Sequence, residues 1–119
     1  MKGFHPWLLG MIVVFVGAVL FVTFALYGIM SKNAAPVAVD RCRALCTEAK
    51  EKGIDLSRGP CLSELYPEKW GVPDWVCDVA HAPRQPVDNL PENQCSDFRE
   101  GRAHHFVEVD GNCNVIRVY

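Results

Sequence analysis

The sequence has no surplus of basic charge, which argues against a nucleic-acid binder because such proteins carry basic patches. Its 119 residues include 12 Lys and Arg against 14 Asp and Glu, a net charge of −2 with neutral histidines. Acidic residues are absent before Asp40, and residues 7–30 carry no charge of either sign. Internal repeats and low-complexity stretches are absent too. One apolar segment followed by one mildly acidic, cysteine-containing module excludes a disordered chain, a plain cytosolic globular domain and a multi-spanning transporter.

The motifs of several enzyme and cofactor classes are also missing. No CxxC occurs, which a thiol oxidoreductase uses at a helix N-terminus, and no CxxCH occurs, which attaches c-type haem. No G-x-S-x-G elbow accompanies the serines, so a Ser-His-Asp triad has no support. The sequence therefore predicts no cofactor, and the balance of the motifs is against catalysis.

The apolar segment from Trp7 to Met30 is long enough to span a membrane. As a helix its 24 residues would measure about 36 Å, against a hydrocarbon core of about 30 Å. A cleaved signal peptide needs a shorter apolar run of roughly 7–15 residues and a small-residue cleavage site. We therefore expect a retained single-pass anchor in the cell membrane. The predicted organisation is a tail at 1–6, a transmembrane helix at 7–30, a linker at 31–39 and a domain at 40–119.

One face of this helix is lined by small residues, namely Gly10, Gly17, Ala25 and Gly28. Small side chains allow another membrane helix to approach closely, so the stripe predicts self-association or packing against another membrane or envelope protein. The alternative is that glycine is simply common in membrane helices. Basic residues flank both ends of the segment and leave its orientation open. The cysteines favour a module on the extracytoplasmic side.

The start of the chain resembles the cleavage site of type IV prepilins. The run Lys2-Gly3-Phe4 precedes the long apolar segment, as in that family, where cleavage falls between the Gly and the Phe. The sequence departs from the family at Leu8, where a glutamate is usual. A filament subunit, with its apolar helix packed in the filament core, is therefore an alternative.

All six cysteines lie in the module, and an even number of cysteines behind an anchor is typical of a disulfide framework. They are Cys42, Cys46, Cys61, Cys77, Cys95 and Cys113. Cys42 and Cys46 lie side by side on one helix face, so we expect them to bond to different segments, with Cys113 and either Cys61 or Cys95 as the natural candidates. The alternative is a zinc site that uses the Cys42-x₃-Cys46 or Cys77-x₃-His81 spacing. Three disulfides are preferred, and no metal is predicted.

The predicted fold class is α+β, with one helix packed on a small antiparallel sheet. The helix is expected over 41–52, with Asp40 as its N-cap and Gly53 ending it. Prolines interrupt the middle of the chain, where short helical turns are expected at 61–66 and 74–81. Alternation over His104–Val109 and Cys113–Tyr119, around Asp110-Gly111, predicts a C-terminal β-hairpin.

The loop between Cys77 and Cys95 holds the most polar residues and supplies the candidate binding residues His81, Arg84 and Asp88. Asp78, Asn89 and Glu92 lie in the same stretch. The alternative is that Asp and Asn make local turns and Arg pairs with a carboxylate.

His104 and His105 are further candidate binding residues. On a strand they would point to opposite faces, which opposes a shared metal. Glu108 and Asp110 would form an acid–base pair if one carboxyl had a raised pKa, but nothing in the sequence places them in a cleft.

The blocks RCRALC, GPCLS, WVCDVAH and DNLPENQC give the module a resemblance to small, uncharacterised, membrane-anchored archaeal proteins rich in cysteine. The resemblance implies an envelope location and no activity. The function predicted from the sequence is a membrane-anchored extracytoplasmic structural or binding module, an accessory subunit that docks on another envelope component. The alternatives are the pilin-like subunit and a small enzyme or metal-binding module built around His81 or His104 and His105.

Overall fold

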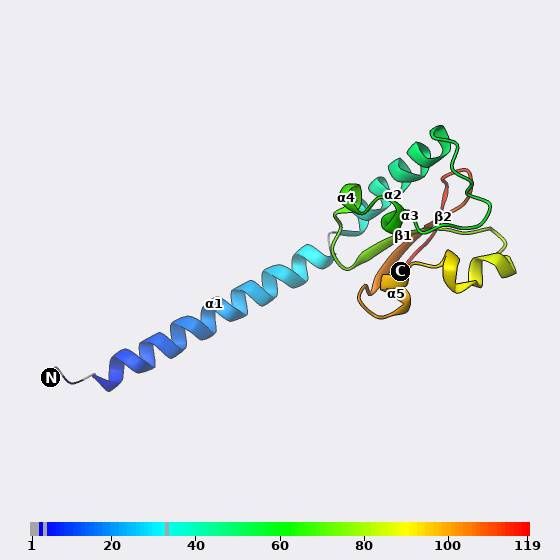
Figure 1. The fold of residues 1–119 in the computed structure, drawn as a ribbon. Coiled ribbons are helices and arrows are strands. Elements are labelled where there is room, and N and C mark those ends of the chain that lie inside the picture. Colours follow the sequence, from blue (N-terminus) through cyan, green and yellow to red (C-terminus); the bar gives the residue numbers. More distant parts are fainter. Residues whose placement is uncertain (1–2, 4, 33) are drawn as a thin grey trace. The chain divides into compact units, whose positions relative to one another are not determined.

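A computed structural model describes residues 3, 5–32 and 34–119. The chain divides into two compact units, residues 1–33 and residues 34–119. In the first unit, α1 (Pro6–Lys32) is a single uninterrupted helix (Figure 1). Its part from Pro6 to Ile29 is long and apolar enough to cross a membrane, and every side chain in that part is exposed. The prepilin-like site includes residues 2 and 4 and so lies outside the described residues.

The second unit begins with α2 (Ala34–Glu51), which starts earlier than the sequence predicted. The linker expected up to residue 39 is wrong from Ala34 onward, and Asp40 lies inside the helix instead of capping it. Alanine is the best helix former, and the fully buried Ala38 extends the apolar stripe of α2 by one more turn. The helix ends at Glu51, and Gly53 stops it as predicted, because its φ of 72° allows the amides of Gly53 and Ile54 to bond back into the last turn.

The sheet has the order β1-β2-β3 and is mixed. Strand β1 (Trp75–Val79) pairs in parallel with β2 (His105–Val109), and β2 pairs antiparallel with β3 (Val115–Val118). The expected antiparallel sheet is therefore wrong for one of its two pairs, and the helical turn expected at 74–81 is a strand. All five residues of β1 are buried. A short run buried on both faces shows no alternation, and its aromatic and β-branched residues favour a strand.

The parallel pairing requires a crossover, which residues 80–104 supply. This stretch contains η1 (Pro86–Asn89), η2 (Pro91–Asn93) and the short helix α5 (Ser96–Arg99). Two further short helices, α3 (Leu62–Leu65) and α4 (Pro67–Trp70), precede β1, and α3 confirms the helical turn expected at 61–66.

The C-terminal hairpin is confirmed, with the register shifted between Glu108 and Val109. Its turn is organised by Asp110, whose Oδ1 accepts the amide protons of Asn112 and Asn114 at 2.9 Å each. These contacts are the side-chain turn that aspartate commonly makes. They hold Cys113 at the end of the hairpin with a φ of 66°.

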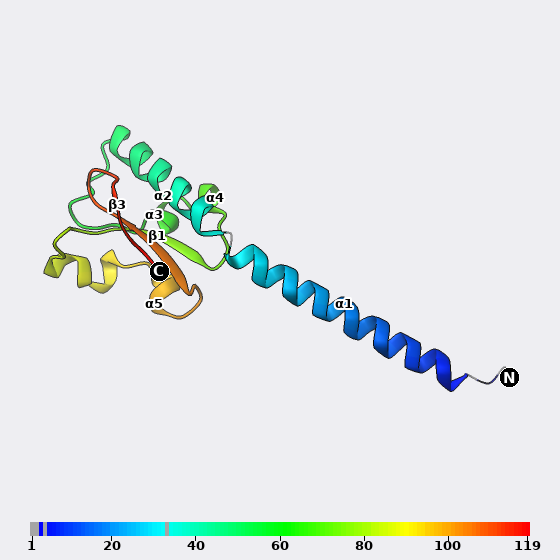
Figure 2. The ribbon, with the colours of Figure 1, turned by 180° about the vertical axis from the view of Figure 1, so that it is seen from behind.

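The two faces of the sheet are covered differently. On the first face, α2 packs over the strands, with Leu45 and Ala49 buried against Val107 and Val109. The second face carries a smaller cluster of Val76, Ala103, Phe106 and the Cys61–Cys95 bridge. Figure 2 shows α2 on one side of the strands and α5 on the other. The second face is thus the less filled side of the domain.

All six cysteines are in disulfides, which confirms the predicted framework. Cys42 and Cys46 bond to different segments, as expected, and Cys46 reaches Cys113. The expectation that one of these two cysteines bonds to Cys61 or Cys95 is wrong. Cys42 bonds to Cys77, because Cys77 lies in β1 and faces α2, whereas Cys61 and Cys95 bond to each other on the second face.

Candidate functional site

A pocket of about 510 Å³ opens on the second face of the sheet. Three strands, α5 and the 80–95 loop contribute to its wall. Its charged residues are Asp78, Arg84, Arg99, Glu108 and Arg117, and its aromatic residues are Phe98, Phe106 and Tyr119; Val76, Gln94 and Cys95 complete the lining. We call this cavity the second-face pocket.

Asp78 and Glu108 lie next to each other in the wall of this pocket. They are paired positions of the parallel strands β1 and β2, so their side chains leave the same face of the sheet. Both are buried, at 8% and 7% exposure. Two buried acidic side chains side by side cannot both stay charged at low cost unless a partner neutralises one of them.

Arg84 is the partner of Glu108. Its guanidinium lies 2.9 Å from Glu108 Oε2 and also donates to Asn89 Oδ1 at 2.7 Å and to the carbonyl of Asp88 at 3.3 Å. Three acceptors on two segments hold the guanidinium in one orientation. The sequence-based alternative for Arg84, pairing with a carboxylate, is confirmed.

Within the part of the chain that the structure describes, Asp78 has no such partner. Its Oδ1 accepts the amide proton of Val79 at 3.1 Å. Burial raises the pKa of the Asp78 carboxyl to about 8, and the negative charge of Glu108 adds to the rise; the amide of Val79 and the charge of Arg84 offset only part of it. At neutral pH the carboxyl is therefore mostly protonated and presents an O–H donor to its surroundings.

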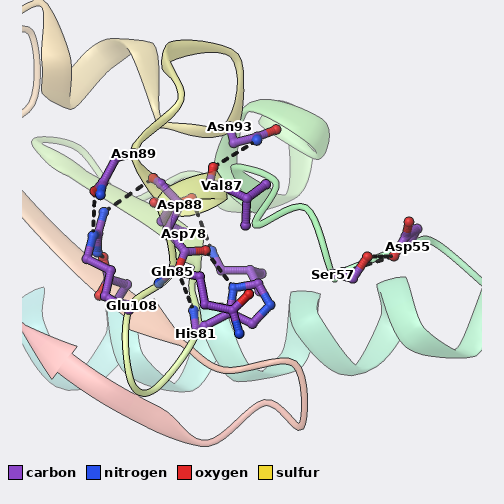
Figure 3. Close-up of polar contacts among 12 residues, drawn as sticks. Asp55, Ser57, Asp78, His81, Gln85, Val87, Asp88, Asn89, Asn93 and Glu108 are labelled. Carbon is purple, nitrogen blue, oxygen red and sulfur yellow. Dashed lines mark hydrogen bonds and ion pairs between the residues drawn. The ribbon is translucent and has the colours of Figure 1, made fainter.

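Asp88 anchors the loop that carries Arg84. Its carboxylate is 2% exposed and accepts the amide protons of His81 and Gln85 at 3.0 and 2.8 Å, with His81 Nδ1 at 2.8 Å from Oδ1. Burial alone would raise the pKa of Asp88, but the hydrogen bonds from Gln85 and His81 outweigh it and lower the pKa. Figure 3 shows His81 and Gln85 gathered around this carboxylate.

Gly59 lies against the same loop, which leaves no space for a side chain. A Cβ at this position would be 2.7 Å from the carbonyl oxygen of Val79 and 3.0 Å from Asp88 Oδ1. The φ angle of Gly59 is 71°, which also favours glycine. Asp88 and His81 thus belong to a tightly packed support beside the pocket. Of the three candidate residues in the loop, only Arg84 lines the pocket itself.

His104 and His105 do not diverge as the sequence predicted. His104 precedes β2, and its Nδ1 lies 2.6 Å from Asp74 Oδ1, while His105 Nε2 lies 3.7 Å from Asp74 Oδ2. His105 also stacks on Trp75, with ring centroids 4.7 Å apart. Neither histidine lines the second-face pocket.

The zinc site considered above would have no thiolate ligands, because all six cysteines are in disulfides. Within residues 3, 5–32 and 34–119, no three His, Cys, Asp or Glu side chains are arranged to hold a metal ion. The Cys77-x₃-His81 spacing does not form a site, since Cys77 is bonded to Cys42 and His81 faces Asp88.

Sequence reasoning named Asp78 and Glu108 in separate places but did not bring them together. It gave no functional role to five other residues of the pocket, namely Phe98, Arg99, Phe106, Arg117 and Tyr119. A signal was present: WVCDV and HFVEV are five-residue runs that each carry one acid at the fourth place, and these acids are register partners. A helical turn predicted at 74–81 leaves Asp78 outside any strand, so the pairing of Asp78 with Glu108 does not follow from the prediction.

Comparison with protein-family models, curated proteins and solved structures finds no match for this chain. The resemblance to small membrane-anchored archaeal proteins therefore stays a prediction.

Proposed function

We propose that the protein is a membrane-anchored binding module whose disulfide-cross-linked domain lies on the extracytoplasmic side. The observation that carries the proposal is the joining of one apolar helix to a domain in which all six cysteines are paired. Structural disulfides persist in oxidising compartments and are rare in the cytosol. The domain is therefore expected on the outer side of the membrane that α1 crosses.

Binding, rather than catalysis, fits the character of the second-face pocket. Arg84 and Glu108 are held against each other and against the loop, which makes a preorganised polar wall. Histidines, the commonest proton-transfer groups, lie outside the lining. The pocket supports the role of an accessory subunit that takes up a ligand and docks on another envelope component.

Two measurements on the full chain test this proposal. Protease treatment of intact cells should remove residues 34–119 and leave α1 protected. Protection of residues 34–119 in intact cells would contradict the proposed topology. Intact mass of the membrane-purified protein should include residues 7–30. A mature chain that begins at Phe4 would instead support the filament-subunit alternative, and one that begins near Ala35 would show that α1 is a cleaved signal.

A further inference from the structure

The second-face pocket has the size of a small-molecule site. Its volume of about 510 Å³ lies within the range of roughly 300–1,000 Å³ that such sites occupy. Its wall is also fixed in place, because Cys95 lines it, precedes α5 and is bonded to Cys61. A rigid wall reduces the ordering cost of binding.

The charges in the pocket are unequal and favour an anion. Three guanidinium groups, those of Arg84, Arg99 and Arg117, face one carboxylate, that of Glu108, since the Asp78 carboxyl is mostly protonated at neutral pH. Glu108 is already paired with Arg84. The pocket therefore has two positive charges beyond its own ion pair.

Among the described residues, neither of the remaining two arginines pairs with a carboxylate of the pocket. Arg99 donates to the carbonyl of Pro91 at 2.7 Å and lies 3.7 Å from Glu100, which is outside the pocket. Arg117 lies over the ring of Phe106 at 5.1 Å, and among the described residues no carboxylate comes within ion-pairing distance of it. A stacked guanidinium keeps its in-plane N–H donors available for a carboxylate.

The aromatic part of the pocket is open to a planar apolar group. Phe98 meets Phe106 edge-to-face at 5.0 Å, and Phe106 stacks with Tyr119 at 5.4 Å. Tyr119 is 62% exposed and Phe98 is 36% exposed. Open aromatic surface beside Arg99 and Arg117, neither of which pairs with a carboxylate of the pocket, suits a ligand with both an apolar body and an anionic head.

We infer that the second-face pocket binds a small organic carboxylate with a flat apolar body, its carboxylate held by Arg99 and Arg117 and its body packed on Phe98 and Tyr119. This ligand class rests on the proposed binding function and names what the pocket takes up. The assignment concerns pocket chemistry and does not depend on which side of the membrane the domain faces.

Binding of such an anion is coupled to the proton on Asp78. The charged and titratable groups that surround this carboxyl are Glu108 on β2, Arg84 and Asp88 on the crossover, Arg99 on α5 and Arg117 on β3. When Asp78 loses its proton, a second negative charge faces the ligand and the O–H donor disappears. Affinity should therefore be highest below the pKa of Asp78 and fall above it.

The test is a titration of the purified full chain in detergent micelles with 3-phenylpropionate, followed by calorimetry or amide chemical shifts. The neutral 3-phenylpropionamide is the matched control ligand. We expect the acid to bind at pH 6.5 and the amide to bind about tenfold more weakly, since it lacks the charge-assisted hydrogen bonds. Equal binding of acid and amide, or no binding of either at millimolar concentration, would overturn the assignment.

Variants locate the site. Arg117→Gln should weaken binding of the acid about tenfold, whereas Arg58→Gln, at an exposed position outside the pocket, should leave it unchanged. Equal effects of the two substitutions would contradict the proposed site.

The pH dependence tests Asp78. Wild-type affinity should fall about tenfold between pH 6.5 and 9, and this fall should vanish in Asp78→Asn, which stays neutral. An unchanged affinity at pH 9 in the wild type would contradict the role of Asp78, and this result does not depend on any variant folding. Failure of these titrations would reject the ligand class, whereas failure of protease shaving would reject the membrane topology, so the two outcomes are distinguishable.

Discussion

Asp78 and Glu108 occupy paired positions of the parallel strands β1 and β2 and are both buried on the same face of the sheet. Arg84 neutralises one of them, and the other keeps its proton to about pH 8. The arrangement makes the stability of the domain depend on pH and on the arginine.

The free energy of unfolding should fall as the pH rises through the range in which Asp78 is protonated in the folded chain but ionised in the unfolded chain. An unfolded aspartate releases its proton near pH 3.9, whereas folded Asp78 holds it to about pH 8. The folded chain binds more protons in that window, so this contribution is full below about pH 4 and lost as pH rises through about 8. The asparagine side chain of Asp78→Asn does not titrate, so the free energy of unfolding of this variant should rise relative to that of wild type as the pH increases. Between about pH 4 and 8 the rise is at most about 1.4 kcal/mol per pH unit.

Urea unfolding at pH 5, 7 and 9, followed by near-UV circular dichroism, measures this gain. Asp40→Asn, at an exposed position of α2, is the control and should run parallel to wild type. A gap between Asp78→Asn and wild type that does not change with pH would refute the assignment of the proton to Asp78.

Arg84→Gln should destabilise the domain by about 2 kcal/mol, because it leaves the buried Glu108 carboxylate without its charged donor. Arg102→Gln is the matched control. Arg102 pairs with Asp97 and Glu100 on the surface, where such pairs contribute about 0–1 kcal/mol. The measurement is the free energy of unfolding of each variant, compared with that of wild type. Equal losses in the two variants would mean that the pocket ion pair is no stronger than a surface pair.

Gly59→Ala should cost more than Gly101→Ala. Both glycines have positive φ, at 71° and 77°, but only Gly59 is crowded, with the Val79 carbonyl 2.7 Å from an added Cβ. Backbone strain of about 1 kcal/mol is common to both, and the clash adds to it at Gly59 alone. Thermal unfolding of the two variants measures the difference. A loss at Gly101 as large as that at Gly59 would show that crowding at the Asp88 loop is unimportant.

Gly17→Leu should weaken association of α1 with itself or with another membrane helix if the stripe of Gly10, Gly17, Ala25 and Gly28 is a packing seam. Within the described residues nothing lies within 4 Å of a Cβ added at Gly17, so the substitution creates no clash inside the chain. Val19→Leu, on the opposite side of the helix from the stripe, is the control. Cross-linking in bilayers measures association, and equal effects of the two changes would leave the stripe without a role.

Features specified by local chemistry were predictable from the sequence. The apolar length of α1, the end of α2 at Gly53, the hairpin around Asp110 and the even cysteine count each follow from a few neighbouring residues. Features set by long-range pairing were not. The five buried residues of β1 show no alternation, so periodicity alone does not separate this strand from a short buried helix. The Cys42–Cys77 bond depends on the position of β1 beside α2, which no neighbouring residues specify.

The candidate site was predictable only in part, for the same reason. Arg84 was named from its polar loop, but its partner Glu108 lies 24 residues away on another strand. The two buried acids meet only because β1 and β2 run parallel, and that pairing depends on the crossover rather than on any local signal.

The intact mass of the protein purified from membranes under thiol-blocking conditions tests the central claim most directly. A membrane-anchored, oxidised module predicts a chain that retains residues 7–30, lacks the six hydrogen atoms that three disulfides remove, and carries no alkylated cysteine. A mass that shows alkylated cysteines, or a chain that begins beyond residue 30, would contradict the account.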